Sequence, residues 1–516
     1  MNASRVRAAF AQIGVTFAAV AVSALMGGCG NNYRPVVTPV PTSGPPPQPS
    51  SFAVVVSTTG SSTDGVVTII DYSGDSVLVE ATIGPGPTAF TLDESGGTGY
   101  TVDSNGTISN FAISTTLQTK NVLTSTLPPT ARVVNLMPPS SGLWATDLNA
   151  DVVDIFAGSP QAFKLAIPVA TAGSPATMPM FVAGSPTISG PREYVISQNV
   201  PDATGQVTCN NPANFAAAPN GAATPIEISS DTTDPAIPVG KCPVYAVPST
   251  DLQRFFVLNR GDDTITVINS KNNTLDTGCP PPTGCTNQNG QTYFTHPVLP
   301  LSTTAVTATG VTPPNGTAGM TAVAGPVYAE YNAATSQLVV ANYDGGSISV
   351  IDVSLDEYGN DSSTFGTTYT ITVGNTATPN PASVTVLYDG SKAYTANQNE
   401  STVTVVNLPT HTVEKTLTVV GHPRTVVNTQ NSEYSKVYVD SPDSPYITII
   451  ESTPTETDVI DTTILLEGLP IDIRTTTQNG SSGNNNYSSR VPGYGQPCNL
   501  PGAASLVSLA ACQATP

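Results

Sequence analysis

The chain is poor in charged residues, cysteine, histidine and tryptophan. Only 10% of its 516 residues are charged, with Lys+Arg 17 against Asp+Glu 37, and it has seven Cys, three His and one Trp. A net charge of −20 repels nucleic acid and argues against nucleic-acid binding. With so few charges, the surface must consist largely of Ser, Thr, Asn and Gln, which is typical of an exported β protein.

Motifs for catalysis and for metal binding are missing as well. The sequence contains no G-x-S-x-G nucleophile elbow, no H-E-x-x-H, no Walker loop and no C-x-x-C. His296, His411 and His422 are scattered, and none lies near a Cys or a Ser in a nucleophile-like context. We therefore expect no cofactor and no metal, and a binding protein is a better expectation than an enzyme.

The N-terminal segment has the layout of a secretory signal. Arg5 and Arg7 precede an apolar run from Ala8 to Met26, which ends at Gly27-Gly28-Cys29. Leu25-Met26-Gly27-Gly28-Cys29 resembles the bacterial lipobox, and this resemblance implies cleavage before Cys29 and lipidation of its thiol. Gly30, in place of the Asp that favours inner-membrane retention, points to the outer membrane. Without Arg5 and Arg7, 15 basic residues remain against 37 acidic ones, a net charge of −22.

Composition divides the chain into four parts. Residues 1–28 are the expected lipoprotein signal peptide, and residues 29–51 are a Pro-rich tether. Residues 52–476 are the expected folded domain. The Gly-, Asn- and Ser-rich residues 477–516 are the expected flexible tail.

A repeated pair of short alternating strands fills the folded domain. Tyr394-Thr-Ala-Asn397 is followed by Val403-Thr-Val-Val-Asn407, and variants of this pair recur near Asn259 and Asn342. Each copy is a hairpin that cannot bury its apolar face alone. We expect the Asn side chain at the end of the strand to bond the backbone of the following turn.

The spacing of the repeats predicts an all-β propeller. From Asn397 to the equivalent Asp440 is 43 residues, close to the length of one four-stranded blade. Joints between blades give eight blades, or seven if residues 175–240 are an insertion rather than a blade. The strand Pro470 to Arg474 is left over at the C-terminal end and is expected to close the ring by completing the first blade.

Tyr394-Thr-Ala-Asn397, Thr402-Val-Thr-Val-Val-Asn407 and Gly421-His-Pro423 resemble the YVTN β-propeller repeat of YncE-like and prokaryotic cell-surface proteins. The resemblance implies the fold. It implies little about activity, because propellers host many functions.

The cysteines other than Cys29 are expected to form disulfides, because six is an even number in an oxidising compartment. The economical pairing is local, although spacing alone does not fix it. It joins Cys209 with Cys242, Cys279 with Cys285, and Cys498 with Cys512.

One geometric argument predicts where a ligand binds. In a four-stranded antiparallel blade, the turn between strands two and three lies on the same face as the joint to the next blade. The cations expected on this face, which would form an anion-attracting patch unless each pairs with a neighbouring Asp, are Arg132, Lys241, Arg260, His422 and Arg424.

The sequence thus predicts a monomeric, lipid-anchored cell-envelope propeller that binds or scaffolds an envelope protein or a small ligand. A propeller lactonase or hydrolase, and a structural surface-layer or adhesion protein, remain the alternatives.

Overall fold

The computed structural model describes residues 51–476 except 94, 139–141, 172–175, 188–189, 200–208, 210–211, 252, 302–323, 431–433 and 453–457. The expected signal peptide, tether and tail lie outside these residues, and so do Cys29, Cys498 and Cys512. Among the described residues, no helix is long and apolar enough to cross a membrane.

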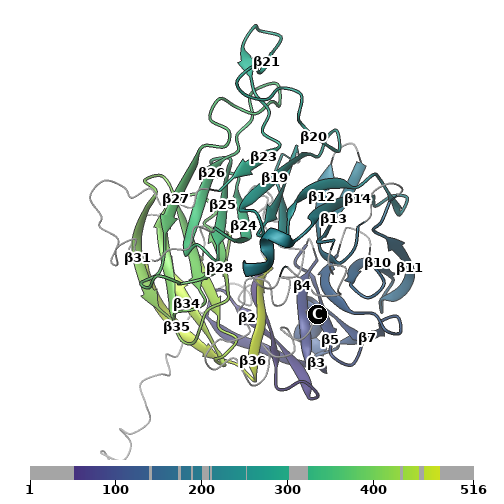
Figure 1. The fold of residues 1–516 in the computed structure, drawn as a ribbon. Helices are drawn as coiled ribbons and strands as arrows, with labels where there is room; N and C mark the ends of the chain where they lie inside the picture. The colour runs from purple at the N-terminus through teal and green to yellow at the C-terminus, as the bar shows by residue number, and fades with distance from the viewer. Residues whose placement is uncertain are drawn as a thin grey trace, which may run out of the picture. The chain divides into compact units, whose positions relative to one another are not determined.

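The described residues form eight antiparallel sheets arranged in a ring, an eight-bladed β-propeller (Figure 1). We number the blades from the one that contains the first strand. From the channel outward, the strands of blade 1 are β36 (Leu469–Thr475), β1 (Phe52–Thr58), β2 (Asp64–Asp71) and β3 (Ser76–Pro85). Those of blade 2 are β4 (Pro87–Leu92), β5 (Thr98–Asp103), β6 (Thr107–Ala112) and β7 (Leu123–Thr126). Those of blade 3 are β8 (Val133–Met137), β9 (Leu143–Asp147), β10 (Val152–Ala157) and β11 (Ala162–Pro168).

Blades 4 and 5 each have a fourth strand in two pieces. The strands of blade 4 are β12 (Pro179–Thr187), β13 (Gly190–Ser197), β14 (Asn220–Glu227), β15 (Thr232–Thr233) and β16 (Ile237–Lys241), and those of blade 5 are β17 (Pro243–Pro248), β18 (Arg254–Asn259), β19 (Thr264–Asn269), β20 (Thr274–Leu275) and β23 (Val298–Pro300). Residues 179–241 therefore form a blade, and the seven-blade alternative is wrong.

Blades 6 to 8 are regular. Blade 6 consists of β24 (Pro326–Asn332), β25 (Gln337–Asn342), β26 (Ser347–Asp352) and β27 (Thr368–Thr372). Blade 7 consists of β28 (Pro381–Val386), β29 (Lys392–Asn397), β30 (Thr402–Asn407) and β31 (Thr412–Thr418). Blade 8 consists of β32 (Thr425–Asn428), β33 (Lys436–Asp440), β34 (Tyr446–Glu451) and β35 (Val459–Leu465).

The C-terminal strand closes the ring, as the sequence predicts. β36 pairs antiparallel with β1, with Val55 opposite Ile473. Ile471 and Ile473 are buried, and the inner strand of blade 1 contacts the inner strands of blades 2 and 8. One blade thus combines three N-terminal strands with one C-terminal strand, so the ring has no open end.

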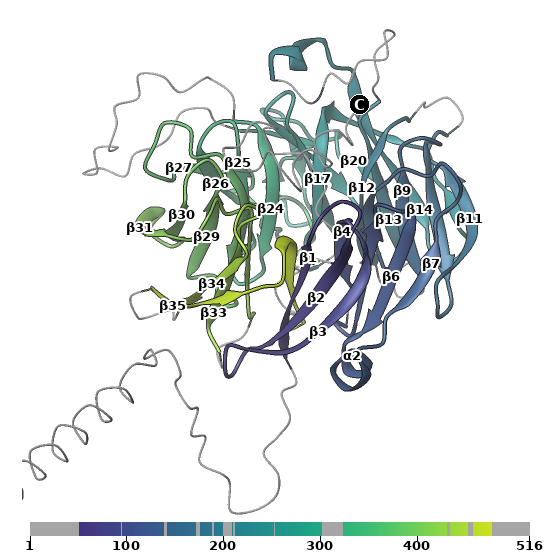
Figure 2. The ribbon, with the colours of Figure 1, turned by 90° about the horizontal axis from the view of Figure 1, so that it is seen from below.

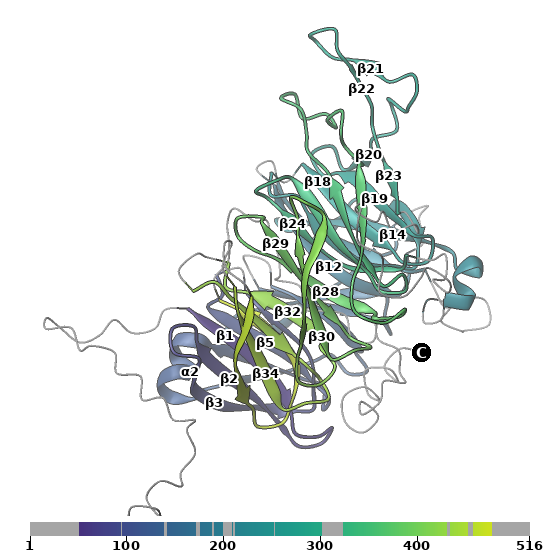
Figure 3. The same cartoon turned by 90° about the vertical axis from the view of Figure 1, so that its left-hand side faces the viewer.

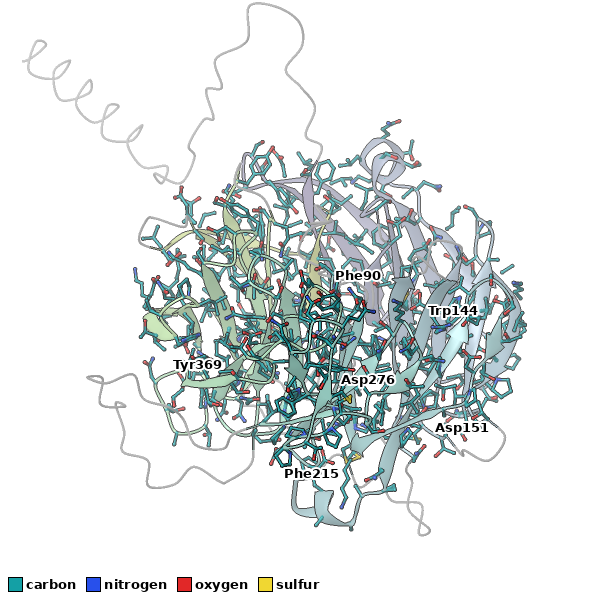
Figure 4. The ribbon with its side chains drawn as sticks, turned by 90° about the horizontal axis from the view of Figure 1, so that it is seen from above. Phe90, Trp144, Asp151, Phe215, Asp276 and Tyr369 are labelled. Atoms are coloured by element: carbon teal, nitrogen blue, oxygen red, sulfur yellow. A yellow bond between two sulfur atoms is a disulfide. The ribbon has the colours of Figure 1, made fainter. Side chains whose placement is uncertain are left out.

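The middle strands are buried along their whole length because neighbouring blades cover both of their faces. Every residue of β18 and β29 is buried, whereas most of the outer strand β31 is not. Trp144, which the sequence assigns to packing, is 1% exposed and packs with Val153 and Val182 of blades 3 and 4 (Figure 4).

The outer strands of blades 1, 3, 7 and 8 interrupt their free edges with bulges. In blades 3, 7 and 8 a charged residue lies at the bulge and has no opposite residue: Lys164, Glu414 and Asp461. A charged bulge disfavours pairing of that edge with another strand.

The inner edges of blades 4 and 7 each donate a backbone hydrogen bond to a side chain of the preceding blade. The backbone N–H of Val182 donates to Asn135 Oδ1 at 2.9 Å, and that of Val386 donates to Glu330 Oε1 at 3.0 Å. Buried side chains therefore take the place of the strand that the channel edge lacks.

Three additions extend the plain ring. The helix α2 (Ile113–Thr119) packs beside β3 (Figure 2). The 3-10 helix η2 (Pro212–Ala217) lies in the insertion between β13 and β14, and the disulfide Cys209–Cys242 fastens this insertion to the next joint. The hairpin of β21 (Cys285–Thr286) and β22 (Thr292–Tyr293) contains the disulfide Cys279–Cys285.

Candidate functional site

One face of the ring carries both the joints and the turns between strands two and three, and we call it the joint face. Hydrogen bonds connect the two kinds of segment directly. The backbone N–H of Gly325, in a joint, donates to Asp263 Oδ1 at 2.8 Å, and that of Met178 donates to Asp151 Oδ1 at 2.7 Å. Joints and second-to-third turns therefore lie on the same face and contact each other, as antiparallel pairing predicts.

The five predicted cations all belong to joint-face segments, but they come from several blades. Arg132 precedes blade 3, Lys241 ends blade 4, Arg260 follows the second strand of blade 5, and His422 and Arg424 precede blade 8.

Lys241 and Arg260 meet at the insertion of blade 4. Lys241 Nζ donates to the Ala216 carbonyl at 2.7 Å, and the Arg260 guanidinium lies 5.6 Å from the Phe215 ring centroid and 5.4 Å from that of Tyr343. Phe215 and η2 thus form a cap beside these two cations (Figure 4).

Arg260 is an interior group rather than a surface cation. Its Nε and Nη2 donate to the two oxygens of Asp344, both at 2.8 Å, and the residue is only 6% exposed. Burial raises the pKa of the neighbouring Tyr343 phenol far above its ordinary value, although the Arg260 charge acts in the opposite direction. Arg260 therefore ties blade 5 to blade 6, and its charge is matched by Asp344.

The other four cations are ordered by their backbones. The N–H groups of Arg132, Lys241 and His422 donate to carboxylates of second-to-third turns or strand ends, namely Asp147 at 2.8 Å, Asp262 at 3.0 Å and Asp443 at 2.8 Å. The Arg424 N–H donates to the Asp440 carbonyl at 3.0 Å. All four residues are partly exposed.

His422 is also held through its ring. Its Nδ1 lies 2.5 Å from Asp443 Oδ2. This contact orients the ring and offsets the charge of its protonated form. Arg260 and His422 thus have side-chain Asp partners, as in the alternative that the sequence left open.

The Asn residues at the ends of second strands bind neighbouring hydroxyls. Asn397 Nδ2 donates to Thr402 Oγ1 at 3.0 Å and to Thr404 Oγ1 at 2.9 Å. Asn259 and Asn342 bond the equivalent Thr and Ser residues. The prediction that they bond the turn backbone is wrong, because the adjacent third strand places hydroxyls within closer reach.

Blade 3 replaces this amide and hydroxyl with two carboxylates. By strand register, Asp147 stands where blade 7 has Asn397, and Asp154 stands where it has Thr404. Asp154 is 2% exposed, and its Oδ2 is buried without a hydrogen-bond partner. Burial and the charge of Asp147 raise the pKa of Asp154 to about 6.

The opposite face holds a second set of contacts between blades that the sequence analysis missed. A cation at the start of a second strand reaches the next blade's turn between strands three and four. Lys392 Nζ lies 3.0 Å from Asp458 Oδ2, and Lys436 Nζ lies 2.6 Å from Asp75 Oδ2. Arg254 Nη2 lies 3.0 Å from Asp361 Oδ1, which belongs to the longer loop between the third and fourth strands of blade 6.

An aromatic residue follows each of these cations two positions later, as in Lys392-Ala-Tyr394. The Tyr394 hydroxyl contacts Asp458 Oδ1 at 2.5 Å, so cation and phenol hold the same carboxylate. A basic residue two positions before the aromatic of the second strand was the available sequence signal. Its long-range partner was not readable from the sequence.

Catalytic geometry is not found in the described part of the chain. No His there hydrogen-bonds a Ser, Thr or Cys side chain, and no group of three or more His, Cys, Asp or Glu residues is placed to hold a metal. A polar groove of about 350 Å³ lies on blade 1 and is lined by Thr59, Asp64, Gly65, Val66, Glu80, Ala81, Thr82, Lys120 and Glu467.

The described residues thus define an eight-bladed β-propeller with ordered cations on its joint face. No family model matches the chain, and no curated protein matches it. Among solved structures, the dihydro-heme d1 dehydrogenase NirN in complex with DHE is similar with a TM-score of 0.53 and 12% identity, covering 84% of this chain and 76% of that one.

Two further structures resemble the chain at lower scores. The apo AztD structure from Citrobacter koseri has a TM-score of 0.49 and 13% identity, covering 82% of this chain and 97% of that one. A Bacteroides fragilis protein provisionally described as a 6-phosphogluconolactonase has a TM-score of 0.47 and 15% identity, covering 84% and 99%. At these identities the likeness concerns the fold alone.

Proposed function

We propose that this protein is a lipid-anchored β-propeller of the YVTN-repeat type that binds an anionic partner of the cell envelope on its joint face. In this proposal Cys29 carries the lipid, the outer membrane holds the anchor, and the propeller acts as a monomeric binding module.

The observation that carries the proposal is the ordering of partly exposed cations on one face of an acidic chain. Arg132, Lys241, His422 and Arg424 are fixed at their backbones by the turns of the joint face, although the net charge of the chain is −20. Cations whose backbones are fixed on one face attract an anion to that face even though the chain as a whole is acidic.

The two disulfides and the sequence before Cys29 support an exported protein. Within the described residues no nucleophile is paired with a base, which favours binding over the lactonase alternative. If the purified propeller hydrolysed members of a lactone panel, the lactonase alternative would replace the binding proposal. Self-assembly of the purified propeller into arrays would favour a structural role.

The test reverses charge on the joint face and measures capture of envelope components. The double variant Arg132→Glu and Arg424→Glu is expected to reduce capture, and capture by the wild type is expected to fall with salt, because exposed charges are screened beyond about 8 to 10 Å at physiological ionic strength. Lys271→Glu, at an exposed turn of the opposite face, is the control for the single variants Arg132→Glu and Arg424→Glu, each of which changes the net charge by the same amount. Equal capture by the joint-face variant and the control would reject the anion-binding face.

A further inference from the structure

The carboxylate pair of blade 3, Asp147 and Asp154, is not explained by an anion-binding joint face. Both residues are buried, at 4% and 2% exposure. The atoms at the corresponding positions of blade 7, Asn397 Nδ2 and Thr404 Oγ1, are 2.9 Å apart, so the strand register brings the two carboxylates within direct reach of each other. Two negative charges this close in an interior repel each other unless a proton or a cation lies between them.

Blade 2, whose second strand is β5 (Figure 3), shows how a single carboxylate at this place is satisfied. The Asp103 carboxylate accepts three hydroxyls at 2.8, 3.1 and 2.7 Å, those of Thr101, Thr107 and Ser109. In the register of blade 3, the same three positions hold Ala145, Val152 and Asp154. Blade 3 therefore lacks all three hydroxyl donors and has a second carboxylate in place of one of them.

The hydrogen bonds that reach the pair leave part of it unsatisfied. The N–H groups of Arg132 and Asn149 donate to Asp147 at 2.8 and 2.9 Å, and both bond the same oxygen, Oδ1. Asp154 Oδ2 is buried and has no hydrogen-bond partner among the described residues. The joint that precedes blade 3 contains Pro128 and Pro129, which have no N–H to donate. A place rich in oxygen acceptors and poor in donors suits a cation.

The chemistry of the pair indicates which cation fits. A divalent ion neutralises both carboxylates, whereas a monovalent ion would leave one negative charge in the interior. In the part of the chain that the structure describes, no group of three or more His, Cys, Asp or Glu residues is placed to hold a metal, so carbonyl oxygens would complete the coordination.

This set of ligands differs from the Cys and His sites that are typical of zinc. Mg²⁺ keeps several of its waters, for which a pair at 4% and 2% exposure leaves little room. Ca²⁺ binds carboxylates and backbone carbonyls in flexible geometry. Of these divalent ions, Ca²⁺ therefore fits the pair best.

We propose that Asp147 and Asp154 bind one Ca²⁺ ion that bridges the second and third strands of blade 3. The path to the site is short, because Asp147 ends β9 beside the exposed turn residues Asn149 and Ala150. The site departs from the sequence-based expectation of no metal, because only the pairing of β9 with β10 brings the two ligands together. Binding of Ca²⁺ here does not require the anionic partner of the joint face.

The first test measures thermal unfolding of the full chain at neutral pH, in chelator and then in Ca²⁺ or Mg²⁺. At a Ca²⁺ concentration about 100-fold above its Kd, the wild-type Tm is expected to rise by about 3 °C. Mg²⁺ is expected to give a smaller rise. Asp154→Thr is expected to lose the response to Ca²⁺, because it removes one ligand and restores the hydroxyl of blade 7. Asp103→Asn, at the equivalent of Asp147 in blade 2, is the matched control and is expected to keep the response.

The second test uses Trp144, the only tryptophan of the chain (Figure 4). Trp144 lies opposite Ile155, the residue next to Asp154, so it is close to the proposed ion. Tb³⁺, a luminescent analogue of Ca²⁺, is expected to show emission sensitised by Trp144 in the wild type and in Asp103→Asn. Ca²⁺ is expected to displace Tb³⁺, and Asp154→Thr is expected to show no sensitised emission.

Three results would overturn the calcium site. An unchanged wild-type Tm in Ca²⁺ would mean that the pair holds a proton only. Equal Tm shifts for the wild type and Asp154→Thr would mean that an adventitious ion only is bound, at carboxylates elsewhere on the chain. Absence of Trp144-sensitised Tb³⁺ emission from the wild type would place the ion outside blade 3. Asp147→Asn, which restores the amide of blade 7, is a second variant with the same expected loss, so the test does not depend on the folding of one variant.

Discussion

Replacing Asp154 with Thr tests whether the carboxylate pair of blade 3 destabilises the propeller at neutral pH. In blade 7 the equivalent hydroxyl of Thr404 accepts both Asn397 Nδ2 and the N–H of Gly374, at 2.9 and 3.0 Å. Thr would restore this arrangement in part beside Asp147.

The missing donor has a local cause. In the joint before blade 7, the N–H of Val373, the residue before Gly374, donates to the Gly346 carbonyl. In the joint before blade 3, the N–H of Leu127 donates to the Gly106 carbonyl in the same way, so Leu127 is the equivalent of Val373. The residue after Leu127 is Pro128, which has no N–H to give to Asp154. Asp154 therefore faces a second carboxylate without the donor that blade 7 provides.

The expected magnitude follows from the pKa. A pKa of about 6 in place of 3.8 for Asp154 corresponds to about 3 kcal/mol at neutral pH. The folded state keeps this proton to a higher pH than the unfolded state. The contribution of Asp154 to stability therefore falls as pH rises from about 4 to about 6, and the penalty is complete above about pH 7.

The assay is thermal and urea unfolding of the wild type and Asp154→Thr at several pH values. The variant is expected to be more stable at pH 7.5 by about 3 kcal/mol, or about 3 °C for a domain of this size, and nearly equal to the wild type at pH 4. Asp75, Asp103 and Asp263 also have pKa values raised by burial, but they are present in both proteins and cancel in the difference. A variant equally or less stable at pH 7.5 would refute the reasoning, and Asp154→Asn is the matched control for side-chain size.

Three further predictions follow from other parts of the molecule. Truncation after Gly468 removes Ile471 and Ile473 and should lower the free energy of unfolding by more than about 5 kcal/mol, since each buried Ile contributes about 2 to 5 kcal/mol. Truncation after residue 477 should leave urea unfolding unchanged, and equal unfolding midpoints for the two truncations would argue against ring closure. Lys392→Ala should cost about 3 to 5 kcal/mol because Asp458 is left buried without its cation, with only the Tyr394 hydroxyl still bonded to it, whereas Lys392→Met with Asp458→Leu should recover most of that loss in the same assay. Cys29→Ser should abolish labelling by a palmitate analogue, and undiminished labelling would exclude the lipid anchor.

Much of the fold was readable from the sequence because it depends on local patterns. Alternation and turn residues define each hairpin, the period of about 43 residues defines the blade, and the unpaired strand from Pro470 requires a partner at the other end of the chain. The coincidence of joints and second-to-third turns on one face also follows from antiparallel pairing alone, so Arg132 and Arg424 could be placed on that face in advance.

The identity of blade 4 was not readable to the same degree. Its second-to-third turn is extended by the insertion containing η2, and its fourth strand is split into β15 and β16, so the regular spacing is lost. Only the pairing of β13 with β14 makes residues 179–241 a blade rather than an excursion.

Partners far apart in the chain were decided by the tertiary structure. Arg260 pairs with Asp344, 84 residues away, and Lys392 with Asp458, 66 residues away, because the ring brings a turn of one blade against its neighbour. The sequence by itself determined the blade, its closure and the face on which each turn lies, since these depend on strand period and direction. The tertiary structure decided which charges are matched and which, like Asp154, are left without a donor, since this depends on the side chains that the adjacent blade and joint place within about 3 Å.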